Sequence, residues 1–168
     1  ALRAAPERRP VPLSKRVVSR LLVASLLLAV GGCATVSWLL HPPPRLPACP
    51  GAIPSAATLP AGDRSWRDRV RYRGGEVDVG FALVAEKQAD RLVLVALNSF
   101  GAKVFSVVQQ QQQLVVDSHL GRALQVPPEL VLRDWYAARA AGVEPPGQLE
   151  LARPECGYAA TFVAEDAR

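Results

Sequence analysis

The sequence lacks the short motifs that carry most enzyme chemistry. Its 168 residues include no methionine, two histidines and three cysteines. No glycine-rich phosphate loop, dinucleotide fingerprint or zinc-ligand spacing is present. His41 lies in a proline-rich stretch, and His119 follows Asp117 and Ser118. Neighbours in sequence do not make a catalytic triad, which needs convergence in space. We therefore expect a protein that is not an enzyme and binds no metal or cofactor.

The sequence also lacks an apolar run long enough to cross a bilayer. The run from Leu21 to Ala29, even when extended through Gly32, is shorter than the roughly 20 residues that a transmembrane helix needs. A basic segment beginning at Lys15 precedes this run, and Gly31-Gly32-Cys33 follows it. This order of segments is typical of a secretory signal. An uncleaved membrane helix is the alternative interpretation.

A cysteine directly after such a signal resembles the precursor of a bacterial lipoprotein. The resemblance implies that residues 1–32 are removed and that Cys33 becomes the acylated first residue, which anchors the protein in a membrane. Ala34 and Thr35 come next, without the aspartate that retains many lipoproteins in the inner membrane. The resemblance therefore favours the outer membrane, with the protein facing the periplasm.

Net charge is nearly absent outside this predicted signal. The formal charge is +5, and residues 1–32 carry all of it, since from Cys33 onward 14 basic residues meet 14 acidic ones. A uniformly basic protein would suggest an anionic partner, but this distribution leads us to expect no nucleic-acid partner. Five arginines between Arg64 and Arg73 alternate with acidic residues. They indicate either a site for phosphate or lipid headgroups or a solvated strand face.

Cysteine is scarce, and three cysteines in an exported chain leave one without a partner. If Cys33 is acylated, Cys49 and Cys156 remain. An oxidising compartment favours a disulfide between them. Two unpaired thiols are the alternative.

The rest of the sequence divides into a tether and one folded domain. Residues 34–62 contain seven prolines and show no helical or strand periodicity, which is typical of a linker. We therefore predict an acylated cysteine and a proline-rich tether over residues 33–62. A single domain is predicted over residues 63–168.

Strand patterns dominate this domain. Apolar and polar residues alternate over 76–85, whereas Leu92–Leu97 is continuously apolar, which predicts a strand covered on both faces. Further strands are predicted over 103–108, 114–116, 148–151 and 158–163, and the glutamines of 109–113 are predicted to form a solvated hairpin connection.

One helix is predicted, opened by Pro127-Pro128-Glu129 and ended by Gly142. Its expected buried stripe consists of Leu130, Val131, Trp135, Ala138 and Ala141. The sum is a mainly β, α+β domain of six or seven antiparallel strands with one helix.

Two segments resemble the outer-membrane lipoprotein receptor of the Lol pathway. Residues 90–107 resemble its central hairpin, in which an Asn-Pro-Leu-Gly turn corresponds to Asn98-Ser99-Phe100-Gly101 here. Residues 126–135 resemble its helix, which contains Arg-x-Trp. The chain is still more similar to uncharacterised bacterial lipoproteins with a Pro-Phe-Gly turn, which are often associated with aryl-polyene gene clusters. Ser99 replaces the proline of either turn.

The resemblance implies an incomplete antiparallel barrel whose concave apolar face accepts acyl chains. It also implies that Phe100 protrudes from the turn toward a membrane or ligand, although a side chain folded back over the rim is the alternative. The other candidates for the apolar lining or mouth are Phe81, Phe105, Leu94, Val79 and Trp135. Only about two dozen residues follow Gly142, so we expect a smaller or more open barrel than the receptor's.

Two functions follow from these expectations. In the first, a lipid-anchored monomer binds or hands over a lipid, an acyl chain of a lipoprotein or another hydrophobic ligand. In the second, the domain is a non-catalytic interaction module for an envelope-assembly partner and has no ligand cavity. Sequence alone does not separate them, because an apolar interior looks the same whether side chains or a ligand fill it.

Overall fold

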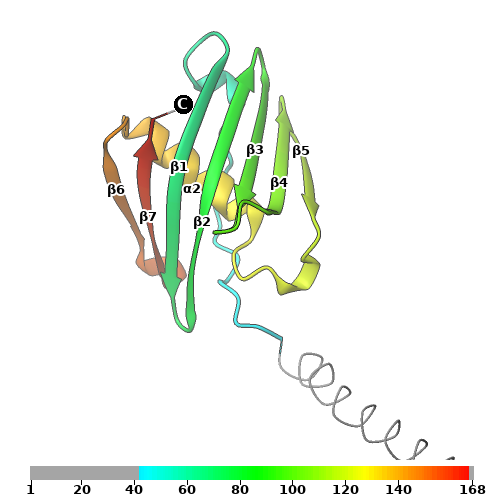
Figure 1. Ribbon diagram of the computed structural model, residues 1–168, viewed down its shortest axis with the longest axis vertical. Helices are drawn as coiled ribbons and strands as arrows, with labels where there is room; N and C mark the ends of the chain where they lie inside the picture. Colours follow the sequence, from blue (N-terminus) through cyan, green and yellow to red (C-terminus); the bar gives the residue numbers. More distant parts are fainter. Residues whose placement is uncertain (1–41, 167–168) are drawn as a thin grey trace, which may run out of the picture. The chain divides into compact units, whose positions relative to one another are not determined.

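The computed structural model describes residues 42–166 (Figure 1). Cys33, His41 and the predicted signal lie outside these residues. A compact unit begins at Pro43. Among the described residues, no helix has the length and apolarity to cross a membrane.

Seven antiparallel strands form one open sheet, in the order β5-β4-β3-β2-β1-β7-β6. Their bounds are β1 (Arg64–Gly74), β2 (Val77–Gln88), β3 (Arg91–Leu97), β4 (Lys103–Gln110), β5 (Gln113–Ser118), β6 (Gln148–Arg153) and β7 (Tyr158–Glu165). The α-helix in the described residues is α2 (Pro128–Ala140), and three short 3-10 turns are η1 (Ala56–Thr58), η2 (Gly121–Ala123) and η3 (Pro154–Cys156). The sheet does not close, so the predicted incomplete antiparallel barrel with one principal helix is confirmed.

The helix covers one face of this sheet (Figure 1). We call this the inner face and the opposite one the outer face. Period-two alternation places Val70 and Tyr72 of β1 on the inner face, beside Phe81 and Leu83 of β2, and all four are buried. Because alternate residues point to opposite faces, Arg67, Arg69, Arg71 and Arg73 of β1 lie on the outer face, whereas Asp68 is buried on the inner face.

The continuously apolar β3 departs from expectation on one face. Leu92, Leu94 and Ala96 are fully buried on the inner face. Val93 and Val95 are only half-buried on the outer face, which no described helix or strand covers. The prediction that both faces of this strand are covered is therefore wrong for the described residues. Neighbouring side chains of the same sheet partly bury Val93 and Val95.

Helix α2 begins and ends where the sequence predicts. Pro128 lies in its first turn with Glu129, and Gly142 adopts a positive φ of 73° just beyond its end, as glycine does at helix C-termini. Leu130, Val131, Trp135 and Ala138 are buried as predicted. Ala141 is exposed instead, because the helix ends at Ala140 and the chain turns away from the sheet there.

The segment before β1 packs against the domain. Leu46, Ala56 and Leu59 are buried in the same core as the sheet residues. The side-chain amide of Gln109 donates to the carbonyl of Pro54 at 2.7 Å, and Lys87 Nζ donates to the carbonyl of Pro60 at 2.9 Å. The packed unit therefore begins well before the predicted start near Asp63.

The glutamine run is only partly a solvated connection. Residues 111–112 form the turn between β4 and β5, but Gln109 is 2% exposed. It belongs to β4, faces the helix and accepts a hydrogen bond from the hydroxyl of Tyr136. The prediction for residue 109 is wrong because its tertiary partners, Tyr136 and Pro54, are distant in sequence.

Candidate functional site

Most side chains predicted to line an acyl cavity are part of a packed core. Leu94, Phe105 and Trp135 are at most 1% exposed and Phe81 is 8% exposed. The rings of Phe81 and Phe105 meet edge to face with centroids 5.8 Å apart. Val79 is half-buried and packs against the same core. These residues therefore hold the inner face of the sheet to α2.

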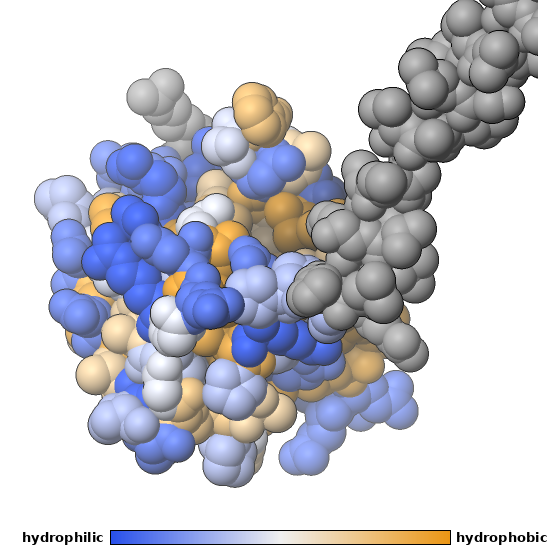
Figure 2. Space-filling model, turned by 90° about the horizontal axis from the view of Figure 1, so that it is seen from below, coloured by the Kyte–Doolittle hydropathy of each residue, from blue (hydrophilic) through white to orange (hydrophobic). Residues whose placement is uncertain are grey.

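A small apolar pocket remains at the edge of this core. Its volume is about 90 Å³, and it lies between β2, β4 and the connection from β5 to α2. Its lining includes Val79, Phe81, Val104, Phe105, Leu120 and Leu124. Small-molecule sites usually measure about 300–1,000 Å³, so this pocket is too small for an acyl chain. Figure 2 shows the domain from below, where hydrophobic residues are exposed among hydrophilic ones.

Phe100 points into solvent at the turn between β3 and β4. It is 93% exposed, the highest value among the exposed large hydrophobic residues. The Asn98 side-chain oxygen accepts hydrogen bonds from the backbone N–H groups of Phe100 and Ala102, both at 2.9 Å. Gly101, with φ at 77°, donates its N–H to the Asn98 carbonyl at 2.9 Å. The turn is therefore fixed by its own hydrogen bonds, with the Phe100 ring outside it.

The same turn borders a groove on the outer face of the sheet. The groove has a volume of about 810 Å³. Asn98 and Ser99 contribute to it from the turn. Its small or apolar lining residues come from β2 and β7 and are Gly80, Ala82, Thr161 and Val163. Its long polar lining residues come from β1, β6 and β7 and are Arg69, Arg71, Arg73, Gln148, Glu150 and Glu165. Phe100 follows Ser99, so it stands at the rim of this groove.

Carboxylates compensate the arginines of the groove. Arg71 donates two hydrogen bonds to Asp78 at 2.6 and 2.7 Å, which hold the pKa of the Asp78 carboxyl below its ordinary value. Arg69 pairs with Glu165, and Arg73 Nε lies 3.7 Å from Asp78. The arginine cluster is thus an exposed strand face of paired charges. A face of paired charges suits a binding partner with a mixed polar surface better than it suits a single phosphate.

Two buried polar clusters attach α2 to the rest of the domain. In the first, the Asp68 carboxylate of β1 accepts hydrogen bonds from Trp135 Nε1 at 2.9 Å and from Arg139 at 2.7 Å. Burial raises the pKa of Asp68, and the charge of Arg139 and the hydrogen bond from Trp135 oppose this shift. Both oxygens of the Asp68 carboxylate are paired with donors of α2, while among the described residues Arg139 Nε has no hydrogen-bond partner. The cluster therefore joins β1 to α2.

The second cluster surrounds the Arg133 and Asp134 side chains of α2. Arg133 donates to the carbonyls of Cys49 at 2.6 Å and Pro50 at 2.9 Å and to the hydroxyl of Tyr158 at 2.9 Å. Tyr158 in turn donates to Asp134 at 2.7 Å. The Arg-x-Trp pair noted in the sequence, Arg133 and Trp135, therefore fixes the helix to the N-terminal segment and to β1.

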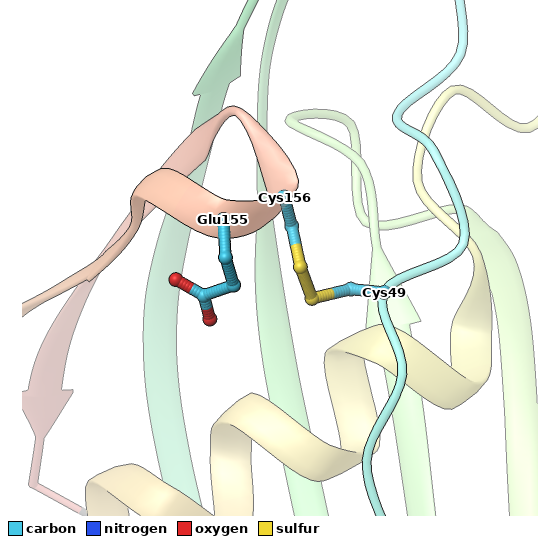
Figure 3. Close-up of side chains that lie close together, drawn as sticks. All are labelled: Cys49, Glu155 and Cys156. Atoms are coloured by element: carbon cyan, nitrogen blue, oxygen red, sulfur yellow. A yellow bond between two sulfur atoms is a disulfide. The ribbon is translucent and has the colours of Figure 1, made fainter.

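Cys49 and Cys156 form a disulfide with Cα atoms 5.5 Å apart. It joins the N-terminal segment to η3, and Glu155 lies beside it (Figure 3). These three residues have the donor types of a metal site. The metal ligand is a thiolate, however, and each sulfur here is bonded to the other. The arrangement therefore acts as a covalent link between two ends of the domain.

Asp117 and Ser118, which precede His119 in the sequence, each contact another residue. Asp117 pairs with Lys103, and the Ser118 hydroxyl donates to the carbonyl of Val104 at 3.3 Å. These partners occupy both side chains.

Sequence reasoning identified Phe100, Asn98 and the arginine strand but missed the groove. Gly80, Thr161 and Gln148 come from three strands that are distant in the sequence, and no local pattern marks them as neighbours. The signal available was the alternation of β1, which places Arg69, Arg71 and Arg73 on one face.

Comparison with known proteins gives one family. The model of a family described as a protein of unknown function, DUF3261, matches residues 65–158, which run from the start of β1 to the start of β7. No curated protein and no solved structure matches the chain significantly.

Proposed function

The chain belongs to the DUF3261 family, and we propose that it is a lipid-anchored, non-catalytic interaction module. In this proposal Cys33 carries the acyl anchor and the folded domain faces the periplasm from the outer membrane. The domain binds an envelope-assembly partner through the Phe100 turn and the outer-face groove beside it. The observation that carries the proposal is the exposure of Phe100 on a turn fixed by Asn98.

The exposed ring of Phe100 does not stabilise the fold. Turn tips favour Asn, Gly or Asp, and an aromatic ring held in water gains nothing from folding. Aromatic residues are enriched at the centres of protein interfaces, where burial of a large ring contributes much of the binding energy. A rigid turn also lowers the entropy lost when the ring is bound.

The groove supplies the polar part of such an interface. Arg69, Arg71 and Arg73 present guanidinium groups beside Gln148 and Thr161. Arginine, like the aromatic residues, is enriched in protein interfaces. A partner surface that combines a hydrophobic pocket for Phe100 with carboxylates or carbonyls for the arginines fits this face.

The packed inner face favours the module over a carrier of acyl chains. Trp135, Tyr72, Phe105 and Phe162 fill the space between the sheet and α2, and the pocket beside them has a volume of about 90 Å³. A carrier resembling the Lol receptor would need a much larger apolar cavity there. In our proposal Phe81, Phe105, Leu94, Val79 and Trp135 are therefore core residues.

Site-specific photo-crosslinking tests the contact directly. A photoreactive phenylalanine analogue is placed at position 100 of the full-length chain, and intact cells are irradiated. We expect one protein adduct of defined mass. The matched control carries the analogue at Glu76, an exposed residue of the turn between β1 and β2, and should give no adduct. Equal adducts at both positions, or adducts with lipid alone, would contradict the proposal.

Native mass spectrometry separates the module from the carrier. We expect the protein purified after expression in lipid-rich cells to show its apo mass, because the core has no room for a ligand. A co-purified lipid that disappears in a Phe105→Trp variant would support the carrier instead. Phe100→Asp should abolish the capture of the crosslinked partner when no irradiation is used. The native mass of this variant should still be that of the ligand-free protein, changed only by the substitution.

The membrane anchor has an independent test. Labelled palmitate should be incorporated into the wild-type chain and not into Cys33→Ser, and the mature protein should begin at Cys33. Failure of labelling would remove the anchor from the proposal but would not affect the contact at Phe100.

A further inference from the structure

The two edges of the open sheet differ in character. At one edge, β6 carries Glu150 on the outer face and ends in Arg153, which binds Asp134. At the other edge, β5 exposes Val115 by 64% and Val116 by 38%. Proteins usually protect free edges with charges, bulges or covering segments, because unpaired backbone groups there accept another strand. Among the described residues, nothing pairs with the free side of β5 (Figure 1).

The backbone of β5 is positioned to accept a further strand. Gln110 and Gln113 flank the two-residue turn from β4, so they form the first hydrogen-bonded pair of the ladder. Hydrogen-bonded and non-hydrogen-bonded pairs alternate in an antiparallel ladder. The N–H and C=O groups of Val115 therefore face β4, whereas those of Leu114 and Val116 face the free edge.

From these features we propose that β5 pairs with β5 of a second copy of this chain. The two strands run antiparallel about a two-fold axis perpendicular to the sheet, with Val115 opposite Val115 of the other copy. The sequence predicts a monomer, but the edge geometry supports a symmetric dimer whose two sheets are continuous. The inference is independent of the Phe100 contact, which lies at the turn between β3 and β4.

Side-chain complementarity selects both the second copy and this register. On the outer face, Val93, Val108 and Val115 lie directly opposite one another across β3, β4 and β5. With Val115 at the axis, this row continues into the same three valines of the other copy. Leu114 then lies opposite Val116 on the inner face, and Gln113 lies opposite Asp117. No like charges face each other, and apolar cross-strand pairs stabilise such ladders.

The register centred on Val116, one residue away, fits less well. A shift that places Val116 at the axis sets Val115 of each copy opposite Asp117 of the other, a carboxylate that already binds Lys103. A self-complementary patch on both partners is the general property of a two-fold interface. The register centred on Val115 has this property.

Engineered disulfides test the register in the full-length chain. The background is Cys33→Ser, so that the introduced thiol is the only free one beside the disulfide of Cys49 and Cys156. Directly opposite residues of a non-hydrogen-bonded pair have Cα atoms about 4.5 Å apart, within the range for a disulfide. Val115→Cys should therefore form a covalent dimer on mild oxidation, and most of the chain should run at twice its mass without reductant.

The matched control is Gln113→Cys on the same face of the same edge. In the proposed register its copies are four residues out of alignment, about 13 Å apart along the strand, so it should stay monomeric on its own. A mixture of Gln113→Cys and Asp117→Cys chains should crosslink, because these positions face each other. Equal crosslinking of Val115→Cys and Gln113→Cys would overturn the register.

The oligomeric state gives a second measurement. Sedimentation of the full-length Cys33→Ser chain should show a concentration-dependent dimer. Val115→Lys, which opposes two like charges at the axis, should raise the dissociation constant at least tenfold, whereas Val115→Thr should keep the dimer. Circular dichroism and thermal unfolding check that each variant is folded. A wild-type chain that stays monomeric at every concentration, or a dimer unchanged by Val115→Lys, would overturn the proposal.

Discussion

The buried carboxylate of Asp68 accepts the indole N–H of Trp135 at 2.9 Å, and this contact joins strand β1 to helix α2. Both residues are fully buried. Arg139 binds the other carboxylate oxygen at 2.7 Å, and its own side chain is 7% exposed. Both oxygens of the Asp68 carboxylate are thus paired in the core with donors from α2.

This relationship predicts a large effect of removing the carboxylate. Asp68→Ala should lower the free energy of unfolding by about 3–5 kcal/mol, because it leaves the Arg139 charge buried without a partner. Asp68→Asn should cost less, since its amide oxygen still accepts the Trp135 N–H. Urea denaturation of the three proteins measures the order. An Asp68→Ala variant as stable as Asp68→Asn would contradict this account of the cluster.

The disulfide between Cys49 and Cys156 should make a comparable contribution. It closes a loop with a sequence separation of 107 residues, and restricting so long a loop in the unfolded chain is worth on the order of 4 kcal/mol. The double variant Cys49→Ser, Cys156→Ser should therefore unfold at a clearly lower denaturant concentration. Reductant should destabilise the wild type to the same level and leave the double variant unchanged. If reductant lowered the denaturation midpoint of both the wild type and the double variant, its effect would not come from this disulfide.

Tyr158 should make stability depend on alkaline pH. Burial and the hydrogen bond to Asp134 raise the pKa of Tyr158 to about 12, above its usual value of about 10. Because the folded chain holds this proton more tightly than the unfolded chain, the contribution is fully present below pH 10. It is lost as the pH rises to about 12, by up to roughly 3 kcal/mol.

The comparison with Tyr158→Phe isolates this contribution. The free energy of unfolding of the variant should fall less steeply between pH 10 and pH 12. Burial also raises the pKa values of Tyr72 and Tyr136, but these residues are present in both proteins. Parallel pH profiles of the two proteins would show that Tyr158 does not titrate as described.

Two residues of the turn between β3 and β4 should differ in their effect on stability: Asn98 stabilises the turn, whereas Phe100 serves the proposed contact. Asn98→Ala removes the acceptor of two backbone N–H groups and should cost about 1–2 kcal/mol. Phe100→Asp removes no contact of a side chain that is 93% exposed, so the free energy of unfolding should change by less than about 0.5 kcal/mol. Thermal unfolding measures both. A large loss for Phe100→Asp would mean that the ring stabilises the fold.

The sequence predicted the strands and the helix well because both have local signatures. The alternation of β2, the breaks at Gly74-Gly75 and Asn98, and Pro128 with Gly142 around α2 follow from backbone geometry alone. The prediction failed where burial depends on distant partners. Gln109 was placed in a solvated connection, yet Tyr136 and Pro54 hold it in the core.

The segment before β1 shows the same limit. Its prolines indicate an extended chain, and the described part contains no strand and only the short turn η1. Proline content does not reveal whether an extended segment is solvated or packed. Leu46 and Leu59 are buried because the inner face of the sheet leaves room beside α2 for them.

By itself, the sequence predicted six or seven antiparallel strands with one helix and placed an aromatic residue, Phe100, at a tight turn, whereas the incomplete barrel was implied by the resemblance to the Lol receptor. These properties depend on residues close together in the chain. Only the tertiary structure decided that side chains fill the inner face, that the arginines of β1 border a groove next to Phe100, and that β5 is an edge with which no other described strand pairs. Each of these depends on strands brought together from distant parts of the chain, and the packing of their side chains has no local pattern.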